Sequence, residues 1–198
     1  MLWGALPSTV AVFPRLLEQA GYFIGHTGKA WGPGSYRAGG WERPPSCKRY
    51  TQQRAKPPQP WIGPLDYASN FQDFLSERPK EKPFCFWLGT TEPHRPYSQG
   101  AGTAAGKRLA DARLPGALPD APETRSDVLD YYTEIEHFDR HLAGIIQTLE
   151  EAGELKNTLI IVTSDNGMCF PRGKASLYDT STRVPLAIRW PGQVPGNR

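Results

Sequence analysis

The sequence predicts an α/β fold in which a mostly parallel sheet is flanked by helices. Segments whose apolar residues recur at three- and four-residue steps alternate with apolar segments of strand length, and this alternation occurs three times along the chain. Such alternation is typical of helices that cover a parallel sheet. The longest strand-like segments are continuously apolar, as strands buried on both faces are.

The first predicted pair is a helix over 8–20 followed by a short strand over 22–25. Ser8 can cap this helix, and Pro14 falls within its first turns, where proline is tolerated best. Gly21 is a natural stop at the carboxyl end of the helix.

The second and third pairs have longer elements. A helix is predicted over 66–78 and a buried strand over 83–89. The clearest helix covers 126–152, and apolar strands follow it at 158–163 and 184–190. The strong helical period of 126–152 makes this helix the most secure element of the prediction.

Two long segments between these elements, 32–64 and 97–124, are predicted to be irregular. The chain contains 20 glycines and 20 prolines, many of which fall in these segments. Long loops on a rigid scaffold are often functional.

Composition excludes several classes of protein. The 198 residues include 23 Lys and Arg against 20 Asp and Glu, a net charge of +3, which is too small an excess for a nucleic-acid-binding protein. No apolar run approaches the roughly 18 residues of a membrane span. The three cysteines, Cys47, Cys85 and Cys169, are too few and too far apart for a disulfide framework or paired zinc motifs. We expect free or buried thiols.

Polar side chains follow three of the predicted strands. Lys29 comes after the first, His94 after the second, and Asp165 and Asn166 after the third, with Lys174 a few residues further on. The carboxyl ends of parallel strands form the edge at which α/β folds bind ligands. Carboxylate and amide oxygens suit Ca²⁺ or Mg²⁺, and lysine and histidine can donate to an oxyanion. Together these groups suggest a metal-assisted site for a sulfate or phosphate ester.

Each of these residues also has a purely structural interpretation. Asp165-Asn166-Gly167 is a good turn sequence, Lys29 can be a solvated surface lysine, and His94 can be a loop histidine. Two other motifs are excluded. Gly28-Lys29 is not a phosphate-binding loop because Ala30 stands where a Ser or Thr would bind Mg²⁺, and no Gly-x-Ser-x-Gly elbow exists.

The order and spacing of four stretches resemble the type I sulfatases of the alkaline phosphatase superfamily, and among them the heparan N-sulfatase (sulfamidase) group. These stretches are 20–29, 83–97, 163–167 and 174–186. The resemblance implies an alkaline-phosphatase-like fold. It also implies that 1–198 is a partial catalytic domain, lacking the amino-terminal nucleophile region and the carboxyl-terminal subdomain, with 32–64 and 97–124 as substrate-side loops.

The resemblance assigns roles position by position. Asp165 and Asn166 match calcium ligands, Lys29 matches a lysine that contacts sulfate and the formylglycine, and His94 matches a histidine that binds sulfate and assists the leaving group. Lys174 matches a second sulfate-binding lysine. In the family, a formylglycine hydrate attacks sulfur beside the metal ion.

The chain departs from the family pattern at two places. Trp31 stands where the family often has a histidine, and the Cys/Ser-x-Pro-Ser-x-Arg signature of the nucleophile is absent, since neither Cys47 nor Cys169 lies in it. The first two calcium carboxylates are absent as well. We therefore expect an internal fragment or truncated product that shows no turnover by itself.

The resemblance implies a sulfated small molecule or glycan as substrate, and a periplasmic, secreted or lysosomal location. The residues expected to face the substrate are Trp31, Tyr36, Arg37, Arg95 and Tyr97. Two alternatives stay open: a phosphodiesterase or phosphonate hydrolase of the same superfamily, and a non-catalytic remnant that binds sulfated glycans. The sequence does not distinguish O-sulfate from N-sulfate and does not predict the oligomeric state.

Overall fold

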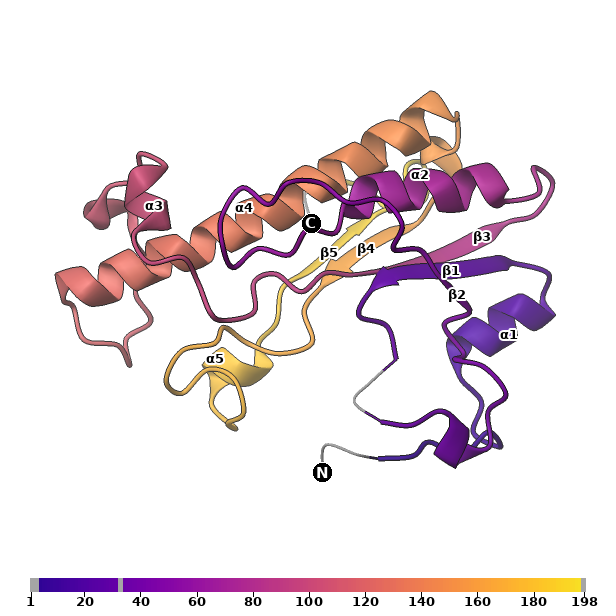
Figure 1. The fold of residues 1–198 in the computed structure, drawn as a ribbon, viewed down its shortest axis with the longest axis horizontal. Coiled ribbons are helices and arrows are strands. Elements are labelled where there is room, and N and C mark those ends of the chain that lie inside the picture. Colours follow the sequence, from indigo (N-terminus) through magenta and orange to yellow (C-terminus); the bar gives the residue numbers. More distant parts are fainter. Residues whose placement is uncertain (1–3, 32–33, 197–198) are drawn as a thin grey trace. The chain divides into compact units, whose positions relative to one another are not determined.

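The computed structural model describes residues 4–31 and 34–196, and Figure 1 shows the order of its elements. The chain divides into two compact units. Unit 1 comprises Met1–Pro58 and Gly63–Thr91, and unit 2 comprises Gln59–Ile62 and Glu92–Arg198.

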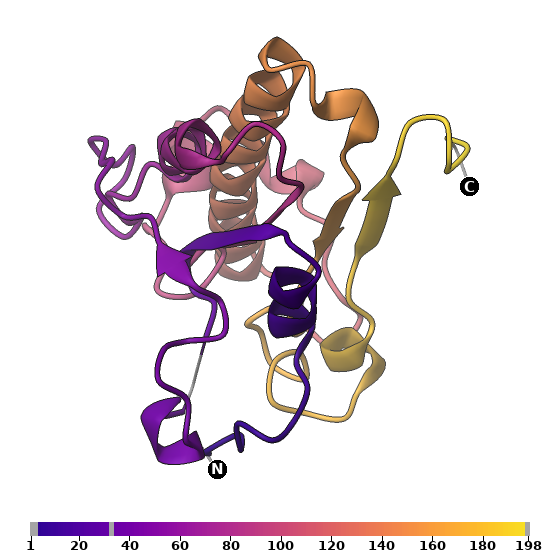
Figure 2. The same ribbon diagram turned by 90° about the vertical axis from the view of Figure 1, so that its right-hand side faces the viewer.

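Unit 1 is built on a parallel sheet of three strands in the order β2-β1-β3. Its elements are α1 (Phe13–Gln19), β1 (Phe23–Gly28), the 3-10 helix η1 (Arg37–Gly39), β2 (Lys48–Arg49), α2 (Tyr67–Glu77) and β3 (Phe84–Gly89). β1 and β3 pair along their whole length, from Phe23 opposite Phe84 to Gly28 opposite Gly89. Their carboxyl ends therefore coincide, and Figure 2 shows α1 beside β1.

An aromatic core joins α2 to this sheet. Asp66 caps α2 by accepting a hydrogen bond from the Ser69 amide at 2.9 Å. The helix then buries Phe74 completely. The ring centroid of Phe74 lies 5.1 Å from that of Phe23 on β1 and 4.7 Å from that of Phe86 on β3. These contacts hold β1 and β3 against one helix face.

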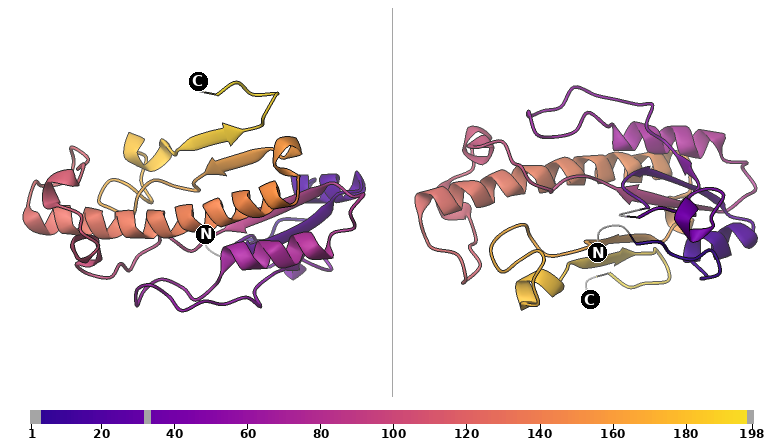
Figure 3. Two further views of the ribbon diagram at one scale, coloured as in Figure 1. Left: turned by 90° about the horizontal axis from the view of Figure 1, so that it is seen from above. Right: turned by 60° about the horizontal axis from the view of Figure 1, so that its bottom comes forward.

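Unit 2 is organised around one long helix. Its elements are α3 (Ala101–Ala104), the 3-10 helix η2 (Leu109–Asp111), α4 (Pro122–Glu151), the 3-10 helix η3 (Leu155–Asn157), β4 (Ile160–Thr163), α5 (Asp179–Thr182) and β5 (Leu186–Arg189). β4 and β5 pair antiparallel, from Ile160 opposite Arg189 to Thr163 opposite Leu186. Figure 3 shows α3 against the amino-terminal part of α4.

The core of unit 2 lies under the amino-terminal half of α4. Val128 and Leu129 are completely buried there, and Tyr97 and Phe170 pack into the same cluster. Pro122 begins the helix, where a missing amide costs nothing, and Gly153 follows its end at a φ of +72°. The core thus joins the segment after Glu92 to the segment after β4.

The α/β class, with a parallel sheet flanked by helices, is confirmed. The expectation that the strands form one sheet is wrong for the described residues, because β4 and β5 form a separate antiparallel pair. The segment between β4 and β5 reverses the direction of the chain, so that β5 runs back along β4, and it contains only the four-residue helix α5.

Smaller differences concern element lengths. β1 extends to Gly28 rather than ending at 25, so His26 and Thr27 lie inside the strand and are buried. The segment predicted as irregular over 32–64 contains η1 and β2, and 97–124 contains α3 and η2. In the described part of the chain, no helix is both long enough and apolar enough to cross a membrane.

Candidate functional site

Lys29 lies directly beyond the carboxyl end of β1 in unit 1. Its backbone amide donates to Gly89 O at 2.5 Å, and Trp87 Nε1 donates to Lys29 O at 3.0 Å. The backbone of Lys29 is therefore tied to the end of β3 by two hydrogen bonds. Its side chain is exposed, and no described residue pairs with its ammonium group.

The last residues of β1 and β3, which lie beside Lys29, are both glycines, and the packing requires glycine there. Gly28 has a φ of +72°, and a β-carbon there would collide with the Gly89 carbonyl. A β-carbon at Gly89 would collide with the Lys29 carbonyl. Glycine at both positions allows the close approach that the Lys29 hydrogen bonds need.

The aromatic and basic residues after Lys29 pack mainly on one another. Trp31 lies edge-on to Trp41, with ring centroids 6.1 Å apart. The guanidinium carbon of Arg37 lies 5.5 Å from the ring centroid of Tyr36. Trp31 and Tyr36 are half-buried and Arg37 is exposed. The contact of these residues with a substrate stays a prediction.

His94 lies in unit 2 with an exposed ring whose tautomer is set by its neighbour. Nδ1 donates to the Arg95 carbonyl at 2.6 Å. A carbonyl can only accept, so in the neutral ring Nδ1 carries the hydrogen and Nε2 carries the lone pair. No described residue engages Nε2, which leaves it available to exchange a proton with a ligand.

The loop that follows β4 places Asp165 and Asn166 side by side. Asp165 is exposed and has no hydrogen-bond or ion-pair partner among the described residues. Asn166 Nδ2 donates to Gly167 O at 2.8 Å, which leaves Oδ1 uncommitted. The loop is held at Gly167, whose amide donates to Ser181 O at 2.9 Å. The Asp165 carboxylate and the Asn166 amide oxygen therefore have no partner within the described ranges of the chain.

Carboxylate and amide oxygens are the kinds of ligand that Ca²⁺ binds, but two residues supply too few of them. Ca²⁺ takes six to eight oxygen ligands. Within residues 4–31 and 34–196, no group of three or more His, Cys, Asp or Glu side chains is arranged to hold a metal ion. The role of Asp165 and Asn166 as calcium ligands therefore stays a prediction.

Lys174 lies further along the same loop and has an exposed side chain. Its backbone amide donates to Met168 O at 2.9 Å, which folds the loop back on itself. No described residue pairs with its ammonium group. Lys29 belongs to unit 1, whereas His94, Asp165, Asn166 and Lys174 belong to unit 2.

Arg95 and Tyr97, predicted to face the substrate, have internal partners in unit 2. The Arg95 guanidinium forms a two-pronged ion pair with Asp127, at 3.0 and 2.5 Å. Tyr97 is 8% exposed, and its hydroxyl donates to Pro93 O at 3.2 Å. Burial raises the pKa of Tyr97 above its usual range. Both side chains therefore have internal partners, and their contact with a substrate stays a prediction.

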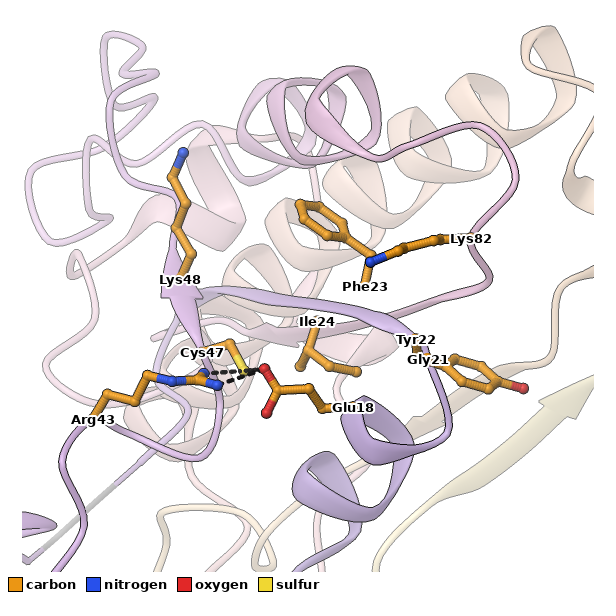
Figure 4. A pocket seen from close by; sticks show the side chains of 9 residues that line it. All are labelled: Glu18, Gly21, Tyr22, Phe23, Ile24, Arg43, Cys47, Lys48 and Lys82. Carbon is orange, nitrogen blue, oxygen red and sulfur yellow. Dashed lines mark hydrogen bonds and ion pairs between the residues drawn. The ribbon is translucent and has the colours of Figure 1, made fainter.

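A separate pocket of about 460 Å³ lies at the amino-terminal end of β1 (Figure 4). Arg43 lines it and donates to Glu18 at 2.5 Å and to Cys47 Sγ at 2.9 Å. Burial raises the pKa of the Cys47 thiol, although Arg43 opposes this effect. The thiol is therefore protonated at neutral pH. This pocket adjoins the opposite end of β1 from Lys29.

Three acidic residues that the sequence analysis does not single out stand on the buried side of α4. Asp127 binds Arg95, and Asp130 accepts hydrogen bonds from the amides of Gly100 at 2.9 Å and Gly102 at 2.7 Å. Glu134 is 1% exposed. Their spacing of three and four residues matches the apolar period of the helix. The signal that could have revealed these three residues is their position within the apolar repeat of the helix, where an acidic side chain must face the core.

Exposed lysine and histidine side chains, and carboxylate and amide oxygens on a loop after a strand, are compatible in chemical type with a site for an anionic ester. The family model described as Sulfatase matches residues 2–198. The chain belongs to the sulfatase family.

Curated relatives include human N-sulphoglucosamine sulphohydrolase, 29% identical over 204 residues that cover 92% of this chain and 39% of the relative. Human N-acetylglucosamine-6-sulfatase is 29% identical over 66% of this chain and 26% of its own length. The chain thus spans well under half the length of these relatives.

Solved structures share the fold at lower identity. A structure described as a 2-O GAG sulfatase matches with a TM-score of 0.61 at 18% identity, covering 94% of this chain and 47% of that one. Another, described as a complex with its substrate D-glucosamine-2-N,6-O-disulfate, matches with a TM-score of 0.60 at 19% identity, covering 92% and 56%. These matches establish the alkaline-phosphatase-like fold of the sulfatases for this chain.

Proposed function

We propose that this chain is the part of a calcium-dependent sulfatase that contacts the sulfate group of a sulfated sugar. The observation that carries the proposal is the state of five side chains. Lys29, His94, Asp165, Asn166 and Lys174 match family roles, and each keeps the functional atom of its role free of described partners. These atoms are therefore available to a ligand, which supports the proposal.

The metal ligands in this proposal are the Asp165 carboxylate and Asn166 Oδ1. The hydrogen bond from Asn166 Nδ2 to Gly167 O turns the amide so that its oxygen, not its nitrogen, is available. A bound Ca²⁺ would supply positive charge beside the sulfate oxygens. The remaining ligands would come from residues other than these two.

The other three residues act on the sulfate group and the leaving group. The ammonium groups of Lys29 and Lys174 would offset negative charge that builds up on the sulfate oxygens. His94, once protonated at Nε2, would donate that proton to the leaving oxygen or nitrogen while Nδ1 keeps its hydrogen bond to Arg95 O. The formylglycine, when present in the complete site, supplies the nucleophile.

The substrate class proposed here is an N- or O-sulfated hexosamine. Its support is the names of the relatives, two of which refer to sulfated glucosamine derivatives. The resemblance also supports a periplasmic, secreted or lysosomal location. Phosphate ester hydrolysis and glycan binding without catalysis are the alternatives that the test must separate.

The test is binding of glucosamine-2-N-sulfate to the full chain with Ca²⁺ present, measured by calorimetry. We expect weak binding that Lys29→Ala and Lys174→Ala each reduce about tenfold, the loss of one charge-assisted contact. Lys156→Ala is the matched control, because Lys156 is an exposed lysine in η3, before β4.

Turnover is measured in the same samples, and we expect none because the nucleophile signature is absent. Release of sulfate by wild type, abolished in Lys29→Ala, would show that the chain has a nucleophile of its own. Tighter binding of glucosamine 6-phosphate than of the sulfated sugar would contradict the sulfatase proposal. Equal binding by wild type and Lys29→Ala would remove Lys29 from the site.

A further inference from the structure

Arg95 in unit 2 connects its own segment to two others, the loop after β4 and the helix α4. Nε donates to Cys169 O at 2.8 Å, in the loop after β4. The two terminal nitrogens donate to the two carboxylate oxygens of Asp127 on α4. The backbone carbonyl of Arg95 accepts the hydrogen bond from His94 Nδ1. The His94 segment, the loop and α4 therefore meet at this residue.

Two aromatic rings hold the guanidinium group. Its central carbon lies 4.5 Å from the ring centroid of Tyr97 and 4.7 Å from that of Phe170. Cations over aromatic faces at this range are attracted to them. The bond to Asp127 raises the pKa of Arg95 above its already high value, so the charge is permanent. The group is thus fixed by charge, hydrogen bonds and packing together.

The contacts of Arg95 lie close in sequence to the candidate site residues. His94 immediately precedes Arg95, and the carbonyl that Nε binds lies three residues after Asn166. Phe170, the next residue after that carbonyl, is buried in the core of unit 2. A shift of the guanidinium group would therefore move both His94 and the loop that carries the side-chain oxygens of Asp165 and Asn166.

We infer that Arg95 and Asp127 form a clamp that fixes the position of His94 relative to the Asp165–Asn166 loop. Arg95 acts in this arrangement as a positioning residue, through its bonds to Asp127 and to the Cys169 carbonyl. The inference rests on the proposed function for its catalytic meaning. The coupling of the His94 segment to the loop after β4 through the Arg95 side chain does not depend on that function.

Lysine is the replacement that separates position from charge. The Arg95→Lys side chain would keep the positive charge, and so part of the ion pair with Asp127. It lacks the planar fork that binds Asp127 with two nitrogens while a third binds the Cys169 carbonyl. Arg95→Lys should therefore leave the chain folded while it frees the loop. Asp127→Asn removes the charge partner and should act on the same two segments.

The chain offers a control pair at the start of the same helix: Arg125 lies on α4, and Asp120 lies just before it. Arg125 donates through Nε and Nη2 to the two oxygens of Asp120, at 2.6 and 2.8 Å, and through Nη1 to two backbone carbonyls. Like Arg95, Arg125 thus binds both oxygens of one carboxylate and also backbone carbonyls, although through different nitrogens, and none of these bonds is made to His94 or to the loop after β4. Arg125→Lys and Asp120→Asn therefore measure what loss of such a pair costs by itself.

The experiment uses nitrogen-15 NMR spectra of the full chain, together with Ca²⁺ affinity from calorimetry. We expect Arg95→Lys to shift the Asn166 and Gly167 amide signals and the His94 ring signals. We also expect it to weaken Ca²⁺ binding about tenfold, the cost of one lost charge-assisted hydrogen bond. Arg125→Lys should leave these signals in place and change Ca²⁺ affinity less than about twofold, within the error of a remote substitution.

Each outcome decides the inference. If Arg95→Lys and Arg125→Lys leave the His94 and Asn166 signals equally unmoved, the clamp does not exist. If Arg95→Lys moves only one of the two segments, the coupling is refuted. If wild type binds no Ca²⁺ but the signals of both segments move together, the clamp is supported and the calcium part of the proposed function fails.

Discussion

Glu134 on α4 is buried with its Oε1 atom unpartnered among the described residues, and it is close enough to Glu92 to feel its charge. Burial and, to a lesser degree, the charge of Glu92 raise the pKa of Glu134 to about 7. Both carboxyl groups are nearly inaccessible, at 1% and 4% exposure. The folded chain therefore holds a proton on Glu134 at pH values where an unfolded chain would lose it.

Stability should fall as the pH rises through this interval. Between the unfolded pKa of 4.5 and the folded pKa of about 7, the folded state binds more protons than the unfolded state. Glu134→Gln, which is neutral at all pH values, should therefore become more stable than wild type as the pH increases. The difference should grow by up to about 3 kcal/mol between pH 5 and pH 8. Urea unfolding at a series of pH values measures it.

Glu150→Gln is the control for this experiment, because Glu150 is exposed on the same helix. Its effect on stability should not vary with pH over the same interval. A pH-independent effect of Glu134→Gln would show that the Glu134 carboxyl is already ionised in the folded chain at pH 5.

Asp130 should be the most costly acidic residue of α4 to remove. Its two oxygens accept the amide hydrogens of Gly100 and Gly102, which tie α3 to the helix. Asp130→Ala would leave two amides without their partner and should cost about 3 kcal/mol of unfolding free energy. Asp139→Ala, an exposed aspartate on the same helix, should cost less than about 0.5 kcal/mol. Equal losses for both variants in urea unfolding would contradict this role.

The contact between the ends of β1 and β3 should not tolerate a side chain. A β-carbon at Gly89 would meet the carbonyl of Lys29, so Gly89→Ala should destabilise the chain by about 1–3 kcal/mol through overpacking. Gly116→Ala is the control, since nothing lies within 4 Å of a β-carbon there. Thermal unfolding compares the two. An unchanged midpoint for Gly89→Ala would mean that the strand ends are further apart than described.

Removal of one candidate metal ligand should abolish most calcium binding. Asp165→Asn keeps the shape of the side chain but loses the charge, and we expect Ca²⁺ affinity to fall about tenfold or more. Asp179→Asn, in α5 of the same unit, should leave the affinity unchanged. Calorimetric titration of the metal-stripped chain measures both. Equal affinities for wild type and Asp165→Asn would exclude Asp165 as a ligand.

The helices are largely predictable because their signals are local. Phe71 and Phe74 stand on one face of a helical pattern, and they form the core against β1 and β3 as this pattern requires. The pattern predicts the long helix over 126–152, and the helix begins earlier, at Pro122. Strand pairing is less predictable, because β2 is only two residues long and carries little hydrophobic pattern.

The residues of the candidate site are also predictable where their signal is local and unpredictable where it depends on distant contacts. Lys29, His94, Asp165, Asn166 and Lys174 can be chosen from their places after apolar segments and from the family resemblance. The sequence predicts that Arg95 faces the substrate, yet its side chain binds Asp127, which lies 32 residues further along the chain. Nothing local in the sequence specifies a partner at that separation.

The sequence by itself determined the α/β class, the helices with strong periodicity, the sulfatase resemblance and the chemical types available for the site. These depend on side-chain patterns within a few residues or on short motifs. Only the tertiary structure decided which strands pair, which acidic residues are buried and that the Arg95 guanidinium pairs with Asp127. Those outcomes depend on which distant segments meet, because burial and an opposite charge change what a side chain can do.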